Sequence, residues 1–238
     1  MDVIDYSRHY KHWHADTAEH IGKMDRLYSR IIAEHFPGDR NASILDVGCG
    51  MGFLLLSLRN AGYTSISGID TDEQQVRSCN EKKLNVSLVQ DSPGYLNDHV
   101  SAYDIITAFD VLEHIPSSQQ ISFVKAINNA LKPGGVFILT VPNANSVLAS
   151  RNRYIDYTHH VLFTEVSLDF VLYNAGFREI DIKPLDYIIP SASVKSIIQR
   201  ILLRYFRMRR RLEMIAELGS TWGKKIPLSF NIIAKAKK

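Results

Sequence analysis

The stretch Ile44-Leu45-Asp46-Val47-Gly48-Cys49-Gly50-Met51-Gly52 decides the fold of this chain. Its first four residues are typical of a buried strand, and three glycines at alternate positions follow before an apolar run, 53–58, that predicts a helix. Glycines lack the Cβ atom that keeps a ligand away from the backbone, and N–H groups at a helix start can face a polar or anionic group. A strand, a glycine turn and a helix in this order predict the ligand-binding corner of a doubly wound α/β domain.

The spacing of the glycines separates two interpretations of this corner. The dinucleotide fingerprint G-x-G-x-x-G would require its third glycine at position 53, which is Phe53. A nicotinamide-dependent dehydrogenase is therefore excluded. The pattern present is Asp46-x-Gly48-x-Gly50-x-Gly52. It resembles the first motif of the class I S-adenosylmethionine (SAM) dependent methyltransferases.

The length and composition of the chain are those of a globular protein with one sizeable core. The chain has 238 residues, of which 45% are hydrophobic and 22% are charged. It contains no long uncharged apolar run and does not begin with a charged and then apolar leader, so we expect neither a membrane span nor a secretory signal. Cys49 and Cys79 lack metal-ligand spacing, which predicts free thiols and a cytoplasmic location.

Two acidic residues downstream extend the pattern. Asp70 ends a second predicted strand, 65–70, about 20 residues beyond the glycine turn, where a carboxylate can accept both hydroxyls of a ribose. The alternative is that Asp70 caps the next helix, although Asp72 is better placed for that role. Asp91 follows a third predicted strand, 85–89. The resemblance implies contact with the adenine amino group, and the alternative is an ordinary turn residue.

The order of elements extends the resemblance over 44–142. A fourth strand is predicted at 103–109, a helix at 121–131 and a fifth strand at 136–141 after Lys132-Pro133-Gly134-Gly135. The resemblance implies an α/β fold with a doubly wound, mostly parallel, seven-stranded Rossmann-like sheet, and SAM as cofactor. It implies the following cofactor set: Asp46, Gly48, Cys49 and Gly50 at the methionine end, Asp70 at the ribose, Asp91 at the adenine, and Phe109 where the fourth strand ends.

The ends of the chain predict an N-terminal helical preface and an antiparallel last strand. We expect residues 1–40 to form a helical lid and 41–238 the methyltransferase domain, with a basic helical insertion at about 191–217. The preface either covers one side of the sheet or closes over the cofactor with Tyr10 or His14 near its amino-acid end. Strand six is predicted at 177–183, and the last strand, 228–235, is expected at the sheet edge.

Candidate catalytic residues follow the fourth strand. Asp110, Glu113 and His114 are spaced i, i+3 and i+4, so a helix starting there would project all three to one side, and His159 is the expected fourth member. The set resembles E-x-x-E-H…H of small-RNA 2′-O-methyltransferases and ubiquinone-pathway O-methyltransferases, which can hold a divalent cation, but Asp110 replaces the first Glu. Three roles stay open: a Mg²⁺ site formed by all four residues, a metal-free site with His159 or His114 as general base, or residues that only shape the pocket. His160 is an alternative to His159.

A further resemblance indicates which class of molecule accepts the methyl group. The stretch Arg153 to Thr164 resembles bacterial methyltransferases encoded with surface-polysaccharide assembly. We therefore expect a cytoplasmic O-methyltransferase acting on a hydroxyl of a glycan or lipid-linked sugar in polysaccharide biosynthesis. A quinone or phenol O-methyltransferase is the nearest alternative, and a non-catalytic SAM-binding regulatory module is the other.

The positive charge of the chain is concentrated in one segment. The net charge is +3, but 191–211 contains seven basic residues and no acid, which leaves −4 on the remainder. Apolar residues recur there at helical spacing, and arginines form a second stripe. The helix either packs on the domain or in a homodimer, or meets an anionic membrane surface or lipid-linked substrate at the inner membrane. Nucleic acid is the weakest alternative because no aromatic residues are interleaved as in a binding module.

Overall fold

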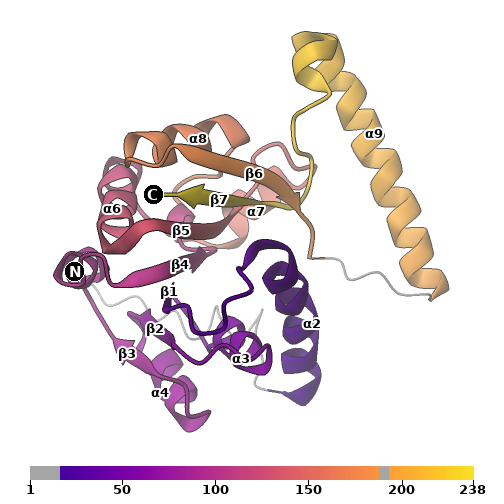
Figure 1. The fold of residues 1–238 in the computed structure, drawn as a ribbon. Coiled ribbons are helices and arrows are strands. Elements are labelled where there is room, and N and C mark those ends of the chain that lie inside the picture. The colour runs from indigo at the N-terminus through magenta and orange to yellow at the C-terminus, as the bar shows by residue number, and fades with distance from the viewer. Residues whose placement is uncertain (1–16, 188–192) are drawn as a thin grey trace.

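The computed structural model describes residues 17–187 and 193–238, and its centre is a seven-stranded sheet (Figure 1). The strands are β1 (Ile44–Val47), β2 (Ile66–Asp70), β3 (Val86–Leu88), β4 (Tyr103–Phe109), β5 (Leu131–Pro142), β6 (Glu179–Leu185) and β7 (Asn231–Lys237). Their order is β3-β2-β1-β4-β5-β7-β6, with β1 to β5 parallel and β7 antiparallel to both neighbours. The predicted doubly wound, mostly parallel α/β sheet is confirmed.

Helices cover both faces of this sheet. They are α2 (Ala18–His35), α3 (Phe53–Asn60), α4 (Glu73–Glu81), α5 (Ser92–Asp98), the 3₁₀ helix η1 (Leu112–His114), α6 (Ser117–Ala130), α7 (Ala149–Ile155), α8 (Glu165–Asn174) and α9 (Val194–Gly223). One apolar cluster lies between the sheet and α6 and α8, and another joins α2 and α3 to the opposite face. Helices on both faces explain why all four residues of β1 and residues 105–108 of β4 are buried.

The last strand lies inside the sheet rather than at its edge. β7 is hydrogen-bonded to β5 on one side and to β6 on the other, so the predicted edge position is wrong. The burial patterns give the reason. Residues 231–234 of β7 are all buried, whereas β6 alternates between exposed and partly buried residues over 179–183. A strand buried on both faces belongs between two others, and an alternating strand can form the edge.

The glycine turn after β1 has the backbone that only glycine adopts without strain. Gly48 has φ +70° and Gly52 has φ +76°. A Cβ on Gly48 would lie 2.6 Å from Cγ2 of Val111, and one on Gly52 would lie 2.5 Å from Cδ1 of Leu84. Both positions therefore require glycine for backbone conformation and for space.

The two segments outside the common sheet differ in how they pack. α2 is part of the core, because its Leu27, Ile31 and Ile32 are buried; Tyr10 and His14 lie outside the described residues. α9 runs alongside the domain and stands clear of it over much of its length (Figure 1). Only Ser196 and Gly223 of α9 are buried. No helix within 17–187 or 193–238 has the length and hydropathy to cross a bilayer.

Candidate active site

A cavity of about 1970 Å³ lies along the carboxyl ends of β1, β2 and β4. Its walls come from the glycine turn, α2, η1, the segment around α7, and α9. Ligands of open α/β sheets bind at this edge. The cofactor and catalytic residues predicted from the sequence line this one cavity, with the exception of Asp91.

Asp46 is a buried carboxylate at the end of β1. Its side chain is 3% exposed, and the Thr107 hydroxyl donates to its Oδ1 at 2.6 Å. Burial raises the pKa of Asp46 to about 7, and the nearby Asp70 carboxylate adds to the effect. A carboxylate that titrates near neutral pH inside a ligand cavity is available to pair with a cation.

Asp70 connects the glycine turn to the end of β2. Its Oδ2 accepts the backbone N–H of Gly50 at 2.8 Å, and its Oδ1 accepts that of Asp72 at 2.9 Å. Burial raises the pKa of Asp70. The cap of α4 is Asp72, whose Oδ1 accepts from Gln74 and Gln75, so the preference for Asp72 as the cap is confirmed.

Asp91 has a structural task in this structure. It is exposed and caps α5, where its Oδ1 accepts the backbone N–H of Gly94 at 3.0 Å. The cavity is lined instead by its neighbours Gln90 and Ser92. An adenine contact by Asp91 stays a prediction, and it would require the side chain to leave this cap.

Cys49 and Phe109 complete the predicted cofactor set. Both line the cavity, and the Phe109 ring stacks on Tyr28 of α2 with centroids 6.0 Å apart. Cys49 and Cys79 are free and buried, as expected. α2 therefore contributes an aromatic wall directly to the cavity.

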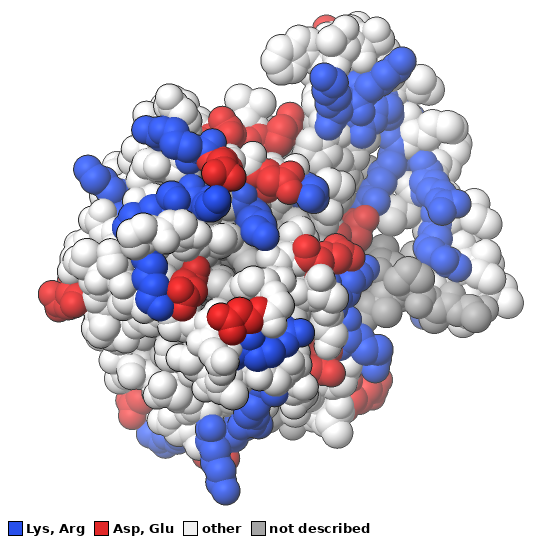
Figure 2. Space-filling view, viewed as in Figure 1, with Lys and Arg blue, Asp and Glu red and all other residues white. Residues whose placement is uncertain are grey.

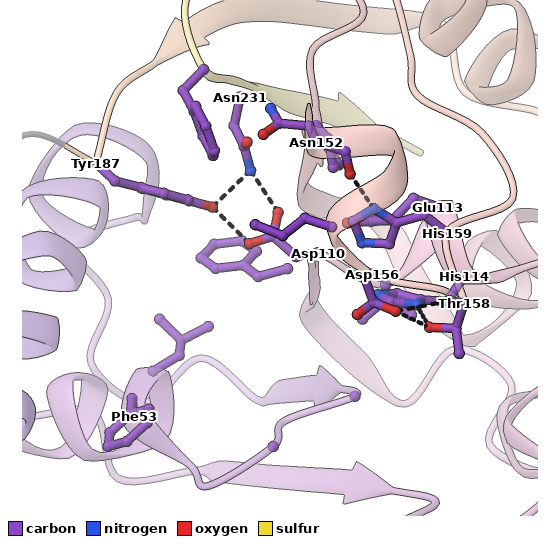
Figure 3. Close-up of a pocket in the computed structure, with 18 of the residues that line it drawn as sticks. Phe53, Asp110, Glu113, His114, Asn152, Asp156, Thr158, His159, Tyr187 and Asn231 are labelled. Carbon is purple, nitrogen blue, oxygen red and sulfur yellow. Dashed lines mark hydrogen bonds between the residues drawn. The ribbon is translucent and has the colours of Figure 1, made fainter. Parts of the chain in front are cut away.

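Asp110 does not join the other three candidate catalytic residues. Figure 3 shows it turned toward Tyr187 and Asn231. The Tyr187 hydroxyl donates to Oδ2 at 2.7 Å, and Asn231 Nδ2 and the Thr140 hydroxyl donate to Oδ1 at 2.7 and 3.0 Å. The predicted i, i+3, i+4 helical face is wrong, because Asp110 has φ +54° and only residues 112–114 form a 3₁₀ turn.

Glu113, His114 and His159 form the cluster that faces the cavity. Each offers one ligand atom within 4.8 Å of the others. Glu113 is fully buried, and within the described residues neither of its carboxylate oxygens has a hydrogen-bond partner. Burial raises the pKa of Glu113 well above its usual value. A buried carboxyl without a partner is costly, which makes Glu113 a candidate for contact with a ligand.

The two histidines are oriented by groups behind them. His159 Nδ1 lies 2.7 Å from the Asn152 carbonyl, and this contact requires an Nδ1–H. His114 Nδ1 lies 2.7 Å from the Thr158 hydroxyl, which donates to Asp156 Oδ1 at 2.7 Å. In the neutral tautomers that these contacts select, each Nε2 carries a lone pair. His160 is exposed and does not line the cavity, whereas His159 does.

Three residues at this site escaped the sequence interpretation. Tyr187 and Asn231 hold Asp110, and Asn152 orients His159. Asn152 Nδ2 and Asn231 Oδ1 are buried atoms without a partner in the described part of the chain. Asn231 begins the last strand and Tyr187 follows β6, and no local motif connects either residue to residue 110. Only the pairing of β7 with β5 places Asn231 beside this site.

The glycine turn, the acids at the ends of β1 and β2, and the cluster after β4 define a SAM-dependent methyltransferase of class I. A family model described as a methyltransferase domain matches residues 20–181, and the chain belongs to that family. The predicted class, including its relation to ubiquinone-type O-methyltransferases, is confirmed.

Individual relatives and solved structures are similar to parts or all of this chain. A ubiquinone biosynthesis O-methyltransferase of Hydrogenovibrio crunogenus is 35% identical over 131 residues, which cover 52% of each chain. The chain thus spans about half the length of the curated relatives it matches. A SAM dependent methyltransferase from Archaeoglobus fulgidus superposes with a TM-score of 0.65 at 22% identity, covering 90% of this chain and 94% of that one. Phosphoethanolamine N-methyltransferase 2 of Haemonchus contortus, solved in complex with SAM, superposes with a TM-score of 0.61 at 15% identity. The superposition covers 100% of this chain and 60% of that one.

Proposed function

We propose that this enzyme methylates a hydroxyl group, with the cluster of Glu113, His114 and His159 facing the acceptor oxygen. One observation carries the proposal: this cluster and the glycine turn line the same cavity. SAM, when bound, supplies an activated methyl group for in-line transfer. The protein then needs to position the acceptor and to remove its proton. An alcohol or phenol needs this help most, because its pKa lies above neutral.

His159 is the proposed general base. Its Nδ1–H is held by the Asn152 carbonyl, which directs the basic Nε2 toward the cluster and fixes the tautomer. Glu113 lies beside it with a pKa that burial raises, and the imidazolium that forms when the proton arrives favours the ionised form of this carboxyl group, so that the two charges stabilise each other. The non-catalytic regulatory module considered from the sequence is therefore not retained.

A divalent cation in the same cluster is the alternative to this general base, because a metal-bound Nε2 of His159 has no lone pair left to accept a proton. The orphaned oxygens of Glu113 and the two Nε2 lone pairs supply one carboxylate and two imidazoles. Because Asp110 is held elsewhere, Glu113 is the only oxygen ligand among the predicted four, and this donor set favours Zn²⁺ over the expected Mg²⁺. Such an ion would act as a Lewis acid that lowers the pKa of the acceptor hydroxyl.

The cofactor is proposed to lie across the glycine turn. Gly48, Cys49 and Gly50 present bare backbone to the methionine end, and Asp46 pairs with its ammonium group. Asp70 accepts the ribose hydroxyls in exchange for its present contacts with Gly50 and Asp72. Phe109 and Tyr28 form an aromatic wall beside the cofactor. The role of a lid that the sequence predicts for residues 1–40 stays a prediction.

A quinol or phenol hydroxyl is the first candidate acceptor. The relatives at 32–35% identity are named ubiquinone biosynthesis O-methyltransferases, and apolar side chains form part of the cavity wall. A sugar hydroxyl of a glycan or lipid-linked glycan is the second candidate. It is favoured by Asn152 Nδ2 and Asn231 Oδ1, which offer one donor and one acceptor to a polyhydroxylated head group. The cytoplasmic location, membrane association and homodimer expected from the sequence stay predictions.

Transfer of a labelled methyl group from SAM tests this function. Purified enzyme is incubated with labelled SAM and either a polyprenylated catechol or a lipid-linked glycan fraction, and products are resolved by mass spectrometry. We expect a product heavier by one CH₂ with the methyl group on oxygen, and none with His159→Ala. Label found on nitrogen, or equal turnover by His159→Ala, would contradict the proposal.

A further inference from the structure

The outer face of α9 is an unbroken apolar stripe. Its members recur at alternating intervals of four and three residues, so they share one side of the helix. The outer stripe consists of Val194, Ile198, Ile201, Tyr205, Met208 and Leu212. Each of these side chains is between 52% and 72% exposed. The stripe runs for about 27 Å at 1.5 Å per residue, and an apolar surface of this length marks an interaction site.

The inner face of α9 belongs to the enzyme cavity. Gln199, Leu203 and Phe206 line it. Arg207 fastens this face to the domain through a two-pronged salt bridge to Asp186, with Nη1 2.7 Å from Oδ2. The helix is thus one wall of the active-site cavity on one side and an open apolar surface on the other.

Charge distinguishes between the partners that such a stripe could meet. Seven basic residues and no acid occur between Ser193 and Leu212, and Figure 2 shows Lys and Arg gathered along α9. Two copies of this chain that met through the stripe would bring two such runs together, which is unfavourable. An anionic lipid surface accepts both features, because acyl chains cover the stripe and head groups neutralise the exposed basic residues. One of these, Arg209, forms an exposed ion pair with Glu213, and such a pair is weak enough to be exchanged for a lipid phosphate. Nucleic acid would leave the stripe in water.

We propose that α9 docks on an anionic membrane surface through the outer stripe, with the exposed Lys195, Arg204 and Arg209 at the head-group level. Because a helix with its side chains is about 10 Å across, docking brings the cavity wall within that distance of the bilayer. The acceptor is then an amphiphile whose apolar chain stays in the membrane while its hydroxylated head enters the cavity. This last statement about the acceptor rests on the proposed methyl transfer.

Vesicle cosedimentation of the full chain tests the docking. We expect binding to vesicles of phosphatidylglycerol and phosphatidylcholine, and none to phosphatidylcholine alone. A stripe variant should lose this binding; it carries Ile198→Asn, Ile201→Asn and Met208→Asn. Its matched control should bind as wild type does; it carries Val166→Asn, Phe170→Asn and Tyr173→Asn on α8, where the side chains are 54–61% exposed. Equal binding of stripe variant and wild type would overturn the proposal.

A charge series separates lipid from other partners. The charge variant replaces Lys195, Arg204 and Arg209 by Gln. Loss of three charges beside an anionic surface should weaken binding roughly 100-fold. The control replaces Arg77, Lys125 and Lys183 by Gln, all exposed on other elements, and should change it little. Equal binding to neutral and anionic vesicles, or a dimer in sedimentation velocity that the stripe variant dissolves without any vesicle binding, would overturn the proposal.

Calorimetry with S-adenosylhomocysteine on the same preparations keeps the two proposals distinct. We expect the stripe and charge variants to bind it as wild type does, which also shows that they are folded. Vesicle binding without any S-adenosylhomocysteine binding in wild type would refute the methyl transfer and leave the docking intact. Nucleoside binding without vesicle binding would refute only the docking.

Discussion

The imidazole rings of His114 and His159 meet edge to face, with centroids 4.7 Å apart and planes at 68°. One ring follows β4 and the other follows α7, and each Nδ1 is held from behind by an oxygen, of Thr158 and Asn152 respectively. The contact brings two bases and the Glu113 carboxylate into one cluster.

His159 should be essential for turnover and unimportant for nucleoside binding. His159→Ala removes the proposed base, and general base catalysis contributes about 100-fold or more to the rate. We expect at least that loss in kcat, with S-adenosylhomocysteine affinity by calorimetry within about twofold of wild type. His160→Ala, which changes an exposed neighbour, should keep normal kcat. Comparable losses in both variants would show that neither imidazole has the assigned role.

Glu113→Gln should stabilise the metal-free protein at alkaline pH. Burial raises the pKa of Glu113, so between its usual pKa and the raised value the folded chain keeps a proton that the unfolded chain has released. Wild-type stability therefore falls as pH rises, and an uncharged Gln abolishes this slope. With chelator present, urea unfolding should show a gain on the order of 1–3 kcal/mol at pH 8 and little change at pH 5.

The same variant tests the cation. Zn²⁺ should raise the free energy of unfolding of wild type at pH 8 and leave Glu113→Gln unaffected, because the carboxylate ligand is gone. Glu179→Gln on the exposed edge strand should respond to Zn²⁺ as wild type does. Wild-type stability and turnover that ignore both Zn²⁺ and exhaustive chelation would remove the metal and leave His159 as a metal-free base.

Cofactor affinity should depend on pH through Asp46. Its pKa is raised to about 7 by burial, so the carboxylate that pairs with the methionine ammonium is present above pH 7 and lost below it. The Kd of S-adenosylhomocysteine, measured by calorimetry, should rise about tenfold per pH unit below 7. Asp46→Asn should bind weakly at every pH without this slope. A pH-independent Kd in wild type would refute the pairing.

Replacing Gly48 by Ala should destabilise the protein more than replacing Gly134, a glycine with a similar backbone conformation, by Ala. Gly48→Ala meets both a left-handed φ and Val111 at 2.6 Å, whereas Gly134→Ala meets the same backbone strain, at φ +78°, with nothing within 4 Å. Strain alone costs about 1–2 kcal/mol, and the clash adds about 1–3 kcal/mol. Urea unfolding should therefore rank Gly48→Ala as the more destabilised, and Val111→Ala should recover part of the difference. Equal losses would contradict this account.

Local spacing was enough to predict the corner of the fold and much of the site. Strand, glycine turn and helix follow from residues 44–58, and β4 ends where its apolar run ends, at Phe109. The place of Asp70 beside the glycine turn follows from its position at the end of the next strand, and Gly50 N–H reaches it directly.

The predictions that failed concern residues whose positions depend on contacts distant in sequence. Asp110 was assigned to the catalytic face from helical spacing, but Asn231 and Tyr187 hold it in another direction through β7 and β6. The side of α9 that faces the domain could not be read from periodicity either. The stripe of apolar residues usually packs inward, and here it faces outward while Arg207 points to Asp186. The direction of the Asp110 side chain and the orientation of α9 are both decided by strands and residues elsewhere in the chain.

A crystal structure of the enzyme with S-adenosylhomocysteine tests the central claim most directly. The account predicts ribose hydroxyls within hydrogen-bond distance of the Asp70 carboxylate, the amino-acid end over Gly48 and Gly50, and the sulfur facing Glu113 and His159. A nucleoside bound elsewhere, or one whose ribose lies away from Asp70 while its sulfur points away from this cluster, would contradict the account.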